Sequence, residues 1–427
     1  MTIADATSPE RGPTGGPRER GYEARQHPPT RMLAAAGIVT AVFVLSNAPT
    51  PLYIRWQSQL DFSSSTLTAL FSVYIVGLLV TLAIAGQCAD RFGCRAVLVP
   101  GIAAGMVACV LFASAESVHA LLLARFVSGI AVASAITAGM ASVMEFGGPQ
   151  RQRTAALLAS ASLVLGAGLG PLLAGVYALT LAAPSGPAFL TELMILAAVG
   201  LLVWTLPFVP REPRARPWRL HAPSVPRQNR THLLVGISAL GCAMSCTAFV
   251  LSLGPSVLAH LTGVTNPLVA GAMACAMFMA ATLAQLPARR SPVRTVFGLA
   301  AGAIIAGMVG AVLAVVTSLA SVLLVGAALA GAGHGLAQLA GLTLIGLHVP
   351  AERRAEATAL LNMGGYVPCG VMPVFTGLLV DRTNLAFGIT CFALCITIIA
   401  IGVWLLVRRT LPLIPAVSSP MNGASIP

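Results

Sequence analysis

Long apolar stretches recur along this sequence, and they constrain its fold more than any other feature. A stretch of about eighteen apolar residues is enough for a helix to cross the hydrocarbon layer of a membrane. The strands of a membrane barrel would alternate apolar and polar residues, and these stretches do not. Only 9% of the residues are charged, far below the level typical of soluble domains. The sequence therefore predicts an all-α membrane protein.

Twelve transmembrane helices are expected, six on each side of a polar linker at 211–231 that is rich in arginine and proline. The expected spans of the first half are 32–54, 65–87, 96–115, 118–144, 155–180 and 188–209. Those of the second half are 232–256, 265–286, 295–316, 319–347, 357–380 and 385–407. The expected domains are a disordered tail at 1–31, helical halves at 32–210 and 232–409, and a second tail at 410–427.

The basic residues predict the orientation in the membrane, because short cytoplasmic loops carry an excess of positive charge. With the amino terminus inside, all but three of the 25 basic residues fall in the tails, the linker or the loops of one side. The exceptions are Arg55 and Arg382 on the other side and Arg125 within a span. Both termini are therefore expected in the cytoplasm of a multi-pass cell-membrane protein. The net charge of +12 is explained by this topology without a nucleic-acid partner.

A short charged stretch joins the second and third expected spans. It comprises residues 86–98 and concentrates Asp90, Arg91 and Arg95 in a chain that is otherwise nearly free of charge. Only a tight hairpin can connect two spans over so few residues. Because Gly86 has no side chain, a neighbouring helix can approach it closely.

The charges of this hairpin are candidates for a latch between the two halves. Asp90 can accept hydrogen bonds from the amino-terminal turn of the helix that opens near 350–356, where the helix dipole is positive. Arg91 and Arg95 are expected to pair with Glu145. Such contacts would join the halves while a central cavity faces outward, and would break as it opens inward. The simpler alternative is that these charges only mark the cytoplasmic face.

Small residues in the fifth expected span also follow a pattern. Gly166, Gly170 and Ala174 recur every four residues, which predicts a smooth helix face against which another helix can pack tightly. Pro171 removes a backbone donor and is expected to bend the helix. The alternative is ordinary packing, because glycine and proline are common in membrane helices.

Three motifs make the chain resemble the major facilitator superfamily over about 32–409. The first motif, Gly86-x-x-x-Asp90-Arg91-x-Gly93-x-Arg95, is similar to the family's signature loop, with Cys94 in place of a usual basic residue. The second motif, Arg125-Phe-Val-Ser-Gly129, is similar to the family's arginine motif. The third motif, Gly166-Ala-Gly-Leu-Gly170-Pro171-Leu-Leu-Ala-Gly175, is similar to a motif linked to proton-driven exporters, with Ala174 in place of the first glycine of a usual pair. The resemblance implies transport by alternating access.

Ionisable residues inside expected spans are functional candidates, because burying them in a membrane is costly. Arg125 lies too deep to reach the interface, and either a functional role or hydrogen bonding to backbone carbonyls accounts for it. Glu192 lies near the outer end of its span and is expected to be exposed to water, with a proton site as the alternative. His334 lies at the middle of its span, where imidazole can carry a proton or contact a substrate, and the alternative is a hydrogen bond to a neighbouring helix.

Five further polar residues lie at depths suited to a central site: Asn47, Tyr74, Gln338, Asn362 and Tyr366. Because charges are so few, the cavity is expected to be mostly apolar, which suits a lipophilic or amphiphilic solute. In proteins built from two repeated halves, the substrate site lies near the midplane between them. Many exporters of the resembled type carry an acidic residue in the first span, and this chain carries none there.

The expected function is proton-coupled export of a lipophilic or amphiphilic small molecule. The alternatives are an uptake symporter or uniporter on the same fold, and a membrane sensor that transports nothing. No sequence motif of a membrane enzyme or of a nucleotide-driven pump is present. We expect no enzymatic activity, no cofactor and no metal. The expected partners are the solute, protons and the lipid bilayer, and a monomer is expected.

Overall fold

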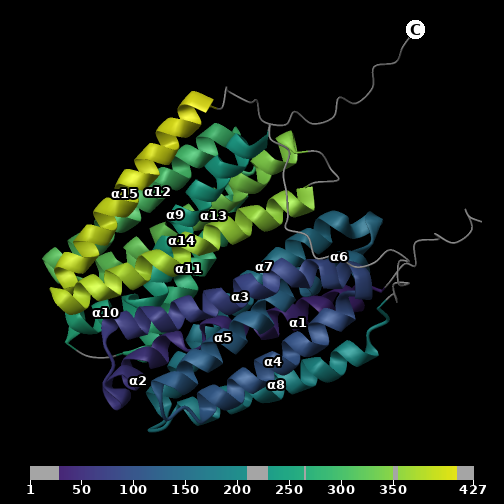
Figure 1. The fold of residues 1–427 in the computed structure, drawn as a ribbon, viewed down its shortest axis with the longest axis horizontal. Helices are drawn as coiled ribbons and strands as arrows, with labels where there is room; N and C mark the ends of the chain where they lie inside the picture. The colour runs from purple at the N-terminus through teal and green to yellow at the C-terminus, as the bar shows by residue number, and fades with distance from the viewer. Residues whose placement is uncertain (1–27, 209–228, 264–265, 350–353, 411–427) are drawn as a thin grey trace, which may run out of the picture.

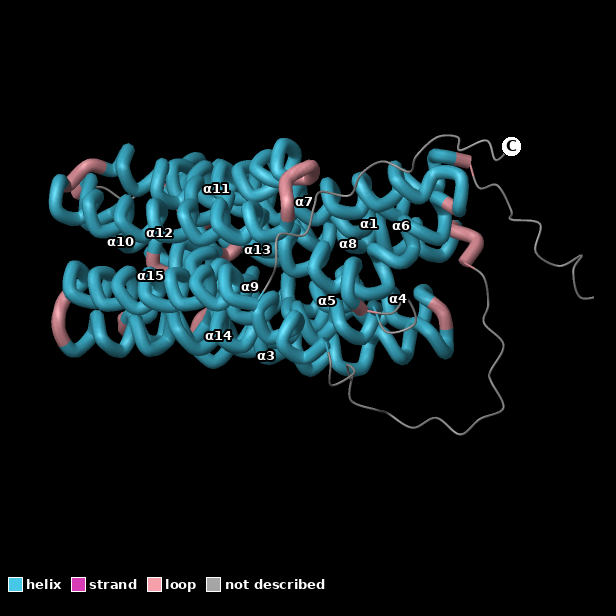
Figure 2. Tube along the Cα trace, turned by 90° about the horizontal axis from the view of Figure 1, so that it is seen from above, coloured by secondary structure: helices cyan, strands magenta, loops and turns pink. Residues whose placement is uncertain are grey.

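The structure is a computed structural model that describes residues 28–208, 229–263, 266–349 and 354–410. All regular elements within these ranges are helices (Figure 2). Helices are favoured because a backbone in hydrocarbon must satisfy its hydrogen bonds within the segment. Twelve helical segments of the described chain are long and apolar enough to cross a membrane. The predicted all-α fold with twelve spans is confirmed.

Six spans come from the residues before the linker, and each overlaps one expected span. The first span is longer than expected and is interrupted after Asn47, because Pro49 and Pro51 lack backbone N–H donors. The helices are α1 (Pro29–Asn47), α2 (Tyr53–Leu60), α3 (Ser64–Phe92), α4 (Cys94–Ala113), α5 (Val118–Ser134), α6 (Met140–Gly147), α7 (Gln152–Thr180) and α8 (Ser185–Thr205). A turn of π-helix at Ala135–Gly139 connects α5 to α6 within the fourth span.

The second group of six spans repeats this arrangement. A short helix again follows the first long one, so that α9 and α10 correspond to α1 and α2. Each span of the first group has a counterpart about 200 residues later, as expected for a repeated half; α5 and α6 together correspond to α13. The helices are α9 (Arg230–Ser252), α10 (Gly254–Thr262), α11 (Pro267–Ala288), α12 (Val293–Thr317), α13 (Ala320–His348), α14 (Arg354–Arg382) and α15 (Leu385–Thr410).

Local signals place several helix ends. The hydroxyl of Ser63 accepts a hydrogen bond from the Thr66 N–H at 3.3 Å and caps α3. The Asn384 side chain accepts from the Phe387 N–H at 2.9 Å and caps α15 in the same way. Gly93 separates α3 from α4 with φ of 86°, a conformation that favours glycine, so the hairpin turns within one residue.

The two halves lie against each other along two pairs of helices (Figure 1). In that view α1–α8 form the lower bundle and α9–α15 the upper one, with α3 beside α14 and α7 beside α11. We call the end of the bundle where α1 begins and α15 finishes the terminal end, and the other the distal end. The hairpin at Gly93 lies at the terminal end, whereas α2 and α10 lie at the distal end.

Glycines allow the helices to pack with their backbones nearly in contact. A Cβ placed on Gly170 of α7 would overlap the Val44 carbonyl of α1. A Cβ on Gly335 of α13 would overlap the Ala281 carbonyl of α11. Close packing of this kind is the main source of association between helices in lipid, where the hydrophobic effect does not operate between them.

We predict that Gly170→Ala destabilises the purified protein, because an added methyl group forces α7 away from α1. Overpacking costs typically about 1–3 kcal/mol, which would lower the thermal midpoint in detergent by several degrees. Gly302→Ala in α12 is the matched control, because its Cβ would meet open space. Its midpoint should be unchanged or raised, since alanine favours the helix. Equal midpoints for the two variants would contradict the proposed backbone contact.

Candidate functional site

A cavity of about 110 Å³ lies between the two halves. The first half contributes α1, α3 and α7 to its wall, and the second half contributes α9, α11, α13 and α14. His334 lies near the middle of α13, so the cavity is at mid-depth, as expected for a site between repeated halves. The wall consists of Phe43, Ser46, Asn47, Phe71, Tyr74, Leu163, Ala167, Leu240, Met244, Thr247, Ala248, Leu251, Phe278, His334, Gln338, Asn362, Tyr366 and Cys369.

The wall brings together six of the polar residues singled out from the sequence. They come from both halves and are Asn47, Tyr74, His334, Gln338, Asn362 and Tyr366. Among the lining residues there is no Asp, Glu, Lys or Arg, and aliphatic and aromatic side chains predominate. The wall is therefore apolar with a few hydrogen-bonding groups, a composition typical of sites for small organic molecules. What each polar residue contributes to function stays a prediction.

Two hydrogen-bonding groups of the wall escaped the sequence analysis. The Thr247 hydroxyl lies 3.0 Å from Nδ1 of His334 and is hydrogen-bonded to it, which orients the ring. The Asn47 amide donates to the Ser46 hydroxyl at 3.0 Å and to the Ala167 carbonyl at 3.5 Å. Ser46 and Thr247 occupy the same position in the first helix of each half, so comparison of the two halves is the signal that would have found them.

Arg125 lies behind this wall and is completely buried. Its Nη1 donates to the Ser46 carbonyl at 2.8 Å, as the structural alternative in the sequence analysis expected. The guanidinium carbon lies between 5.1 and 5.7 Å from the ring centroids of Tyr53, Phe71 and Tyr74, within the range of cation–π attraction. Its Nε and Nη2 have no hydrogen-bond partner within the described chain. Arg125 therefore adds positive charge beside the cavity without lining it.

Glu192 lies away from the cavity, and the expectation that it is exposed to water was wrong. Only 4% of its surface is accessible, because α8 packs this face against α4 and α1. One turn earlier on α8, Phe189 stacks on Phe112 and Trp56. The Glu192 Oε1 has no hydrogen-bond partner among the described residues. Glu192 is thus a buried carboxyl group inside the first half.

Arg95 does not pair with Glu145 in this conformation, contrary to expectation. Its Nη2 donates to three carbonyl groups at the end of α8, those of Val203 at 3.1 Å, Trp204 at 2.7 Å and Leu206 at 3.4 Å. The physical reason is that the last carbonyls of a helix lack partners and carry partial negative charge. The guanidinium also lies over the rings of Trp204 and Phe208.

The remaining hairpin residues leave the expected latch untested. A Cβ placed on Gly86 would meet no atom of another described helix within 4 Å, so no described helix approaches it closely here. Arg91 lies over the ring of Phe92, with 5.6 Å to its centroid. The side chain of Asp90 and most of the helix opening near 350–356 lie outside the described residues.

The glycine run of α7 contacts two helices on two sides. The face formed by Gly166 and Gly170 packs against α1 of the same half, so the expected smooth face is present. The contact with the other half comes from a different side of α7, where Pro171 lies against Gly271 of α11 and Gly175 against the start of α11. α7 continues as a helix through Pro171. The same segment therefore joins both halves.

Contacts near the distal end connect the halves, and the sequence analysis did not identify them. The Asp381 carboxylate at the end of α14 accepts hydrogen bonds from the backbone N–H groups of Ser64 at 2.8 Å and Ser65 at 2.9 Å. These groups form the first turn of α3, where the helix dipole attracts negative charge. Farther along the same helices, the Ser72 hydroxyl donates to the Gly370 carbonyl.

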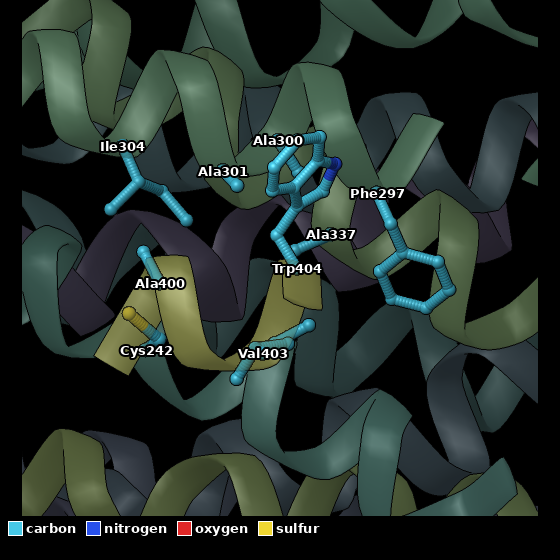
Figure 3. Close-up of a pocket in the computed structure, with 10 residues that line it drawn as sticks. Cys242, Phe297, Ala300, Ala301, Ile304, Ala337, Ala400, Val403 and Trp404 are labelled. Carbon is cyan, nitrogen blue, oxygen red and sulfur yellow. The ribbon is translucent and has the colours of Figure 1, made fainter. Parts of the chain in front are cut away.

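A second cavity lies within the second half and is too small for a solute. It measures about 10 Å³, roughly the space of one water molecule, and has an apolar wall. Figure 3 shows the rings of Trp404 and Phe297 close to small residues of the wall such as Ala300 and Ala337. The described residues contain no cluster of His, Cys, Asp and Glu that suits a metal ion.

Solved structures of transporters have the same fold. A POT family transporter, PepTSo, aligns with 89% of this chain and 98% of its own at a TM-score of 0.73 and 10% identity. The nucleoside transporter NupG aligns with 88% of this chain and 98% of its own at 0.68 and 14% identity. A bacterial homolog of the human lysosomal transporter Spinster, inward-facing and unoccupied, aligns with 89% of this chain and 97% of its own at 0.65 and 15% identity.

No curated protein gives a significant match to the sequence. The family model of the Major Facilitator Superfamily matches residues 32–313 and 288–421, which overlap all twelve described spans. The match, the twelve helices in two repeated halves and the cavity between them lead to one conclusion. The chain belongs to the Major Facilitator Superfamily.

Proposed function

We propose that the protein is a secondary active transporter that exports a lipophilic or amphiphilic small molecule in exchange for protons. The observation that carries the proposal is the cavity between the halves, with an apolar wall and a few hydrogen-bonding side chains. A solute with an apolar body and one or two polar groups matches such a wall. The buried charge of Arg125 beside the cavity disfavours cationic solutes and favours neutral or weakly acidic ones.

Alternating access is the mechanism that the contacts between the halves support. Near the distal end the halves are joined by Asp381 to α3 and by the α7–α11 contact, whereas Gly86 near the terminal end faces open space. With both termini in the cytoplasm, this is an inward-facing state. Rocking of the halves would break the Asp381 contacts and bring Asp90 to the start of α14, as the latch hypothesis requires.

The direction of transport rests on the α7 motif. Its resemblance to the motif of proton-driven exporters favours export, and Pro171 and Gly175 contact the second half, where a leak-tight seal is needed. The alternative is an uptake symporter or uniporter. The nucleoside transporter and the POT family transporter with the same fold keep this alternative open, because fold alone does not determine the direction or the substrate.

The deciding measurement uses everted membrane vesicles with an imposed pH gradient and a pH-sensitive dye. Lipophilic cations, neutral compounds and weak acids are added in turn. We expect neutral or weakly acidic amphiphiles to dissipate the gradient only when the protein is present. No response from vesicles that contain the folded protein would contradict proton-coupled export and favour uptake or a non-transporting sensor.

His334 is the proton-binding candidate that the cavity favours, because it is the titratable imidazole on the wall. His334→Ala should alter the substrate range or the dependence of transport on pH, because the variant has no imidazole on the wall to carry a proton or contact the solute. Thr247→Val is the control, since it removes the hydrogen bond to the ring and keeps the titratable group. A pH profile of His334→Ala identical to that of the unmodified protein would assign the residue to packing.

The two aspartates at opposite ends of the bundle should have opposite effects on its conformation. Asp381→Asn weakens the contact with the α3 backbone, so spin labels at Gln59 and Thr383 should report a larger fraction of long distances. Asp90→Asn should lower transport while the protein stays in the membrane. In this variant the same two spin labels should report a larger fraction of short distances.

Asp61→Asn is the matched control for this pair, because Asp61 is an exposed aspartate at the distal end, just before α3. Its distance distribution should equal that of the unmodified protein. Unchanged distances in Asp381→Asn would contradict the role of Asp381 in closing the distal end. Full transport by Asp90→Asn would contradict the latch at the terminal end.

A further inference from the structure

A groove of about 440 Å³ lies on the outside of the first half at the terminal end. It is formed where α4 begins and α8 finishes, far from the central cavity. Arg95 lies in it beside the rings of Trp204 and Phe208, and its guanidinium carbon is 5.0 and 5.8 Å from their centroids. Val99 and Pro100 complete the wall, together with Phe92, Gly93 and Ala96.

A second groove, of about 500 Å³, lies on the outside of the second half. It is formed where α12 begins and α15 finishes, and its wall contains Arg294, Trp404 and Arg408. The guanidinium carbon of Arg408 lies 4.8 Å from the Trp404 ring centroid. Gly298 makes room for the indole, since a Cβ there would lie 3.0 Å from its Nε1.

The two grooves are equivalent positions of the repeated halves. α12 and α15 are the counterparts of α4 and α8, so Arg294 and Trp404 stand where Arg95 and Trp204 stand in the first half. Sequence similarity between the halves is otherwise faint. A cation and an indole that recur at one place in both halves indicate a shared requirement at that place, beyond a general excess of arginine on one side.

We propose that each groove binds the headgroup phosphate of an anionic phospholipid. Neither wall contains a carboxylate, so each groove combines positive charge with an aromatic platform. Basic pockets between membrane helices bind anionic lipid headgroups, and tryptophan favours the headgroup level. Trp204 is 63% exposed and Leu201, one turn below it on α8, is 71% exposed, so acyl chains have an apolar surface beneath the charge.

The hydrogen bonds of Arg95 hold its side chain in one position, from which the guanidinium can bind a phosphate. Its hydrogen bonds within the described chain all run from Nη2 to the end of α8, which positions the guanidinium in the groove. A phosphate beside it would gain charge-assisted hydrogen bonds from a preorganised donor. The headgroup of a lipid and inorganic phosphate share this chemistry, and the experiment below distinguishes them.

The test uses tryptophan fluorescence, because the chain has four tryptophans and two of them lie in the grooves. One variant retains only Trp204 and another only Trp404, the others being replaced by phenylalanine. Each is reconstituted in phosphatidylcholine bilayers that contain brominated phosphatidylglycerol or, at equal mole fraction, brominated phosphatidylcholine. Bromine quenches indole on contact, so quenching reports which lipid occupies each groove.

We expect phosphatidylglycerol to be preferred about fivefold at Trp204, because the groove there contains one arginine and each arginine contributes about 1 kcal/mol. At Trp404, where Arg294 and Arg408 both line the groove, the preference should be about thirtyfold. Arg95→Gln should abolish the preference at Trp204 and leave that at Trp404 intact. The double variant Arg294→Gln, Arg408→Gln should abolish the preference at Trp404 and leave that at Trp204 intact. The unaffected groove is an internal control for folding in each case.

Three outcomes would overturn the proposal. Equal quenching by the two lipids would mean that only unselective boundary lipid contacts the grooves. A preference that survives the arginine substitutions would place its origin elsewhere on the protein. Loss of the preference on adding millimolar inorganic phosphate at constant ionic strength would identify free phosphate, rather than a lipid, as the occupant.

Discussion

Close backbone contact along α7 determines how the two halves of this protein are positioned relative to each other. Apolar helices in lipid gain little from burying one another, so their association depends on close packing. Gly170 brings α7 against α1 within the first half, and one residue later Pro171 lies against Gly271 of the second half. The short segment therefore couples the internal packing of one half to the interface with the other. The cavity occupies the space that this interface leaves at mid-depth.

Two charged side chains of the described chain, Asp381 and Arg95, bind the ends of neighbouring helices. Asp381 accepts from the first turn of α3, and Arg95 donates to the last carbonyls of α8. Both contacts satisfy backbone groups that a helix leaves without partners, and both match the sign of the helix dipole. Arg125 follows the same principle at greater depth, where one backbone carbonyl and three aromatic rings surround it. Contacts of this kind, made to helix ends, are compatible with the proposed rocking of the halves.

The two halves have equivalent residues in their outer grooves but contribute different residues to the central cavity and its surroundings. The grooves at Arg95 and Arg294 occupy equivalent positions, as expected for surfaces that face the same lipid. The cavity is asymmetric, because the imidazole of His334 lies on the second half and the buried charge of Arg125 belongs to the first. A solute that interacts differently with its two sides fits this arrangement better than a symmetric one.

The number of spans, their approximate boundaries and the family followed from the sequence, because hydropathy and motif spacing are properties of neighbouring residues. The polar residues of the cavity, such as Asn47 and Tyr366, were identifiable by depth alone. The direction in which a side chain points was not, since helices that are apolar all round carry no periodic signal of their inner face. Tertiary packing therefore decided that Glu192 is buried, that Arg95 faces α8, and that Asp381 joins α14 to α3. Each depends on which helices become neighbours, and that is determined by contacts between residues far apart in the chain.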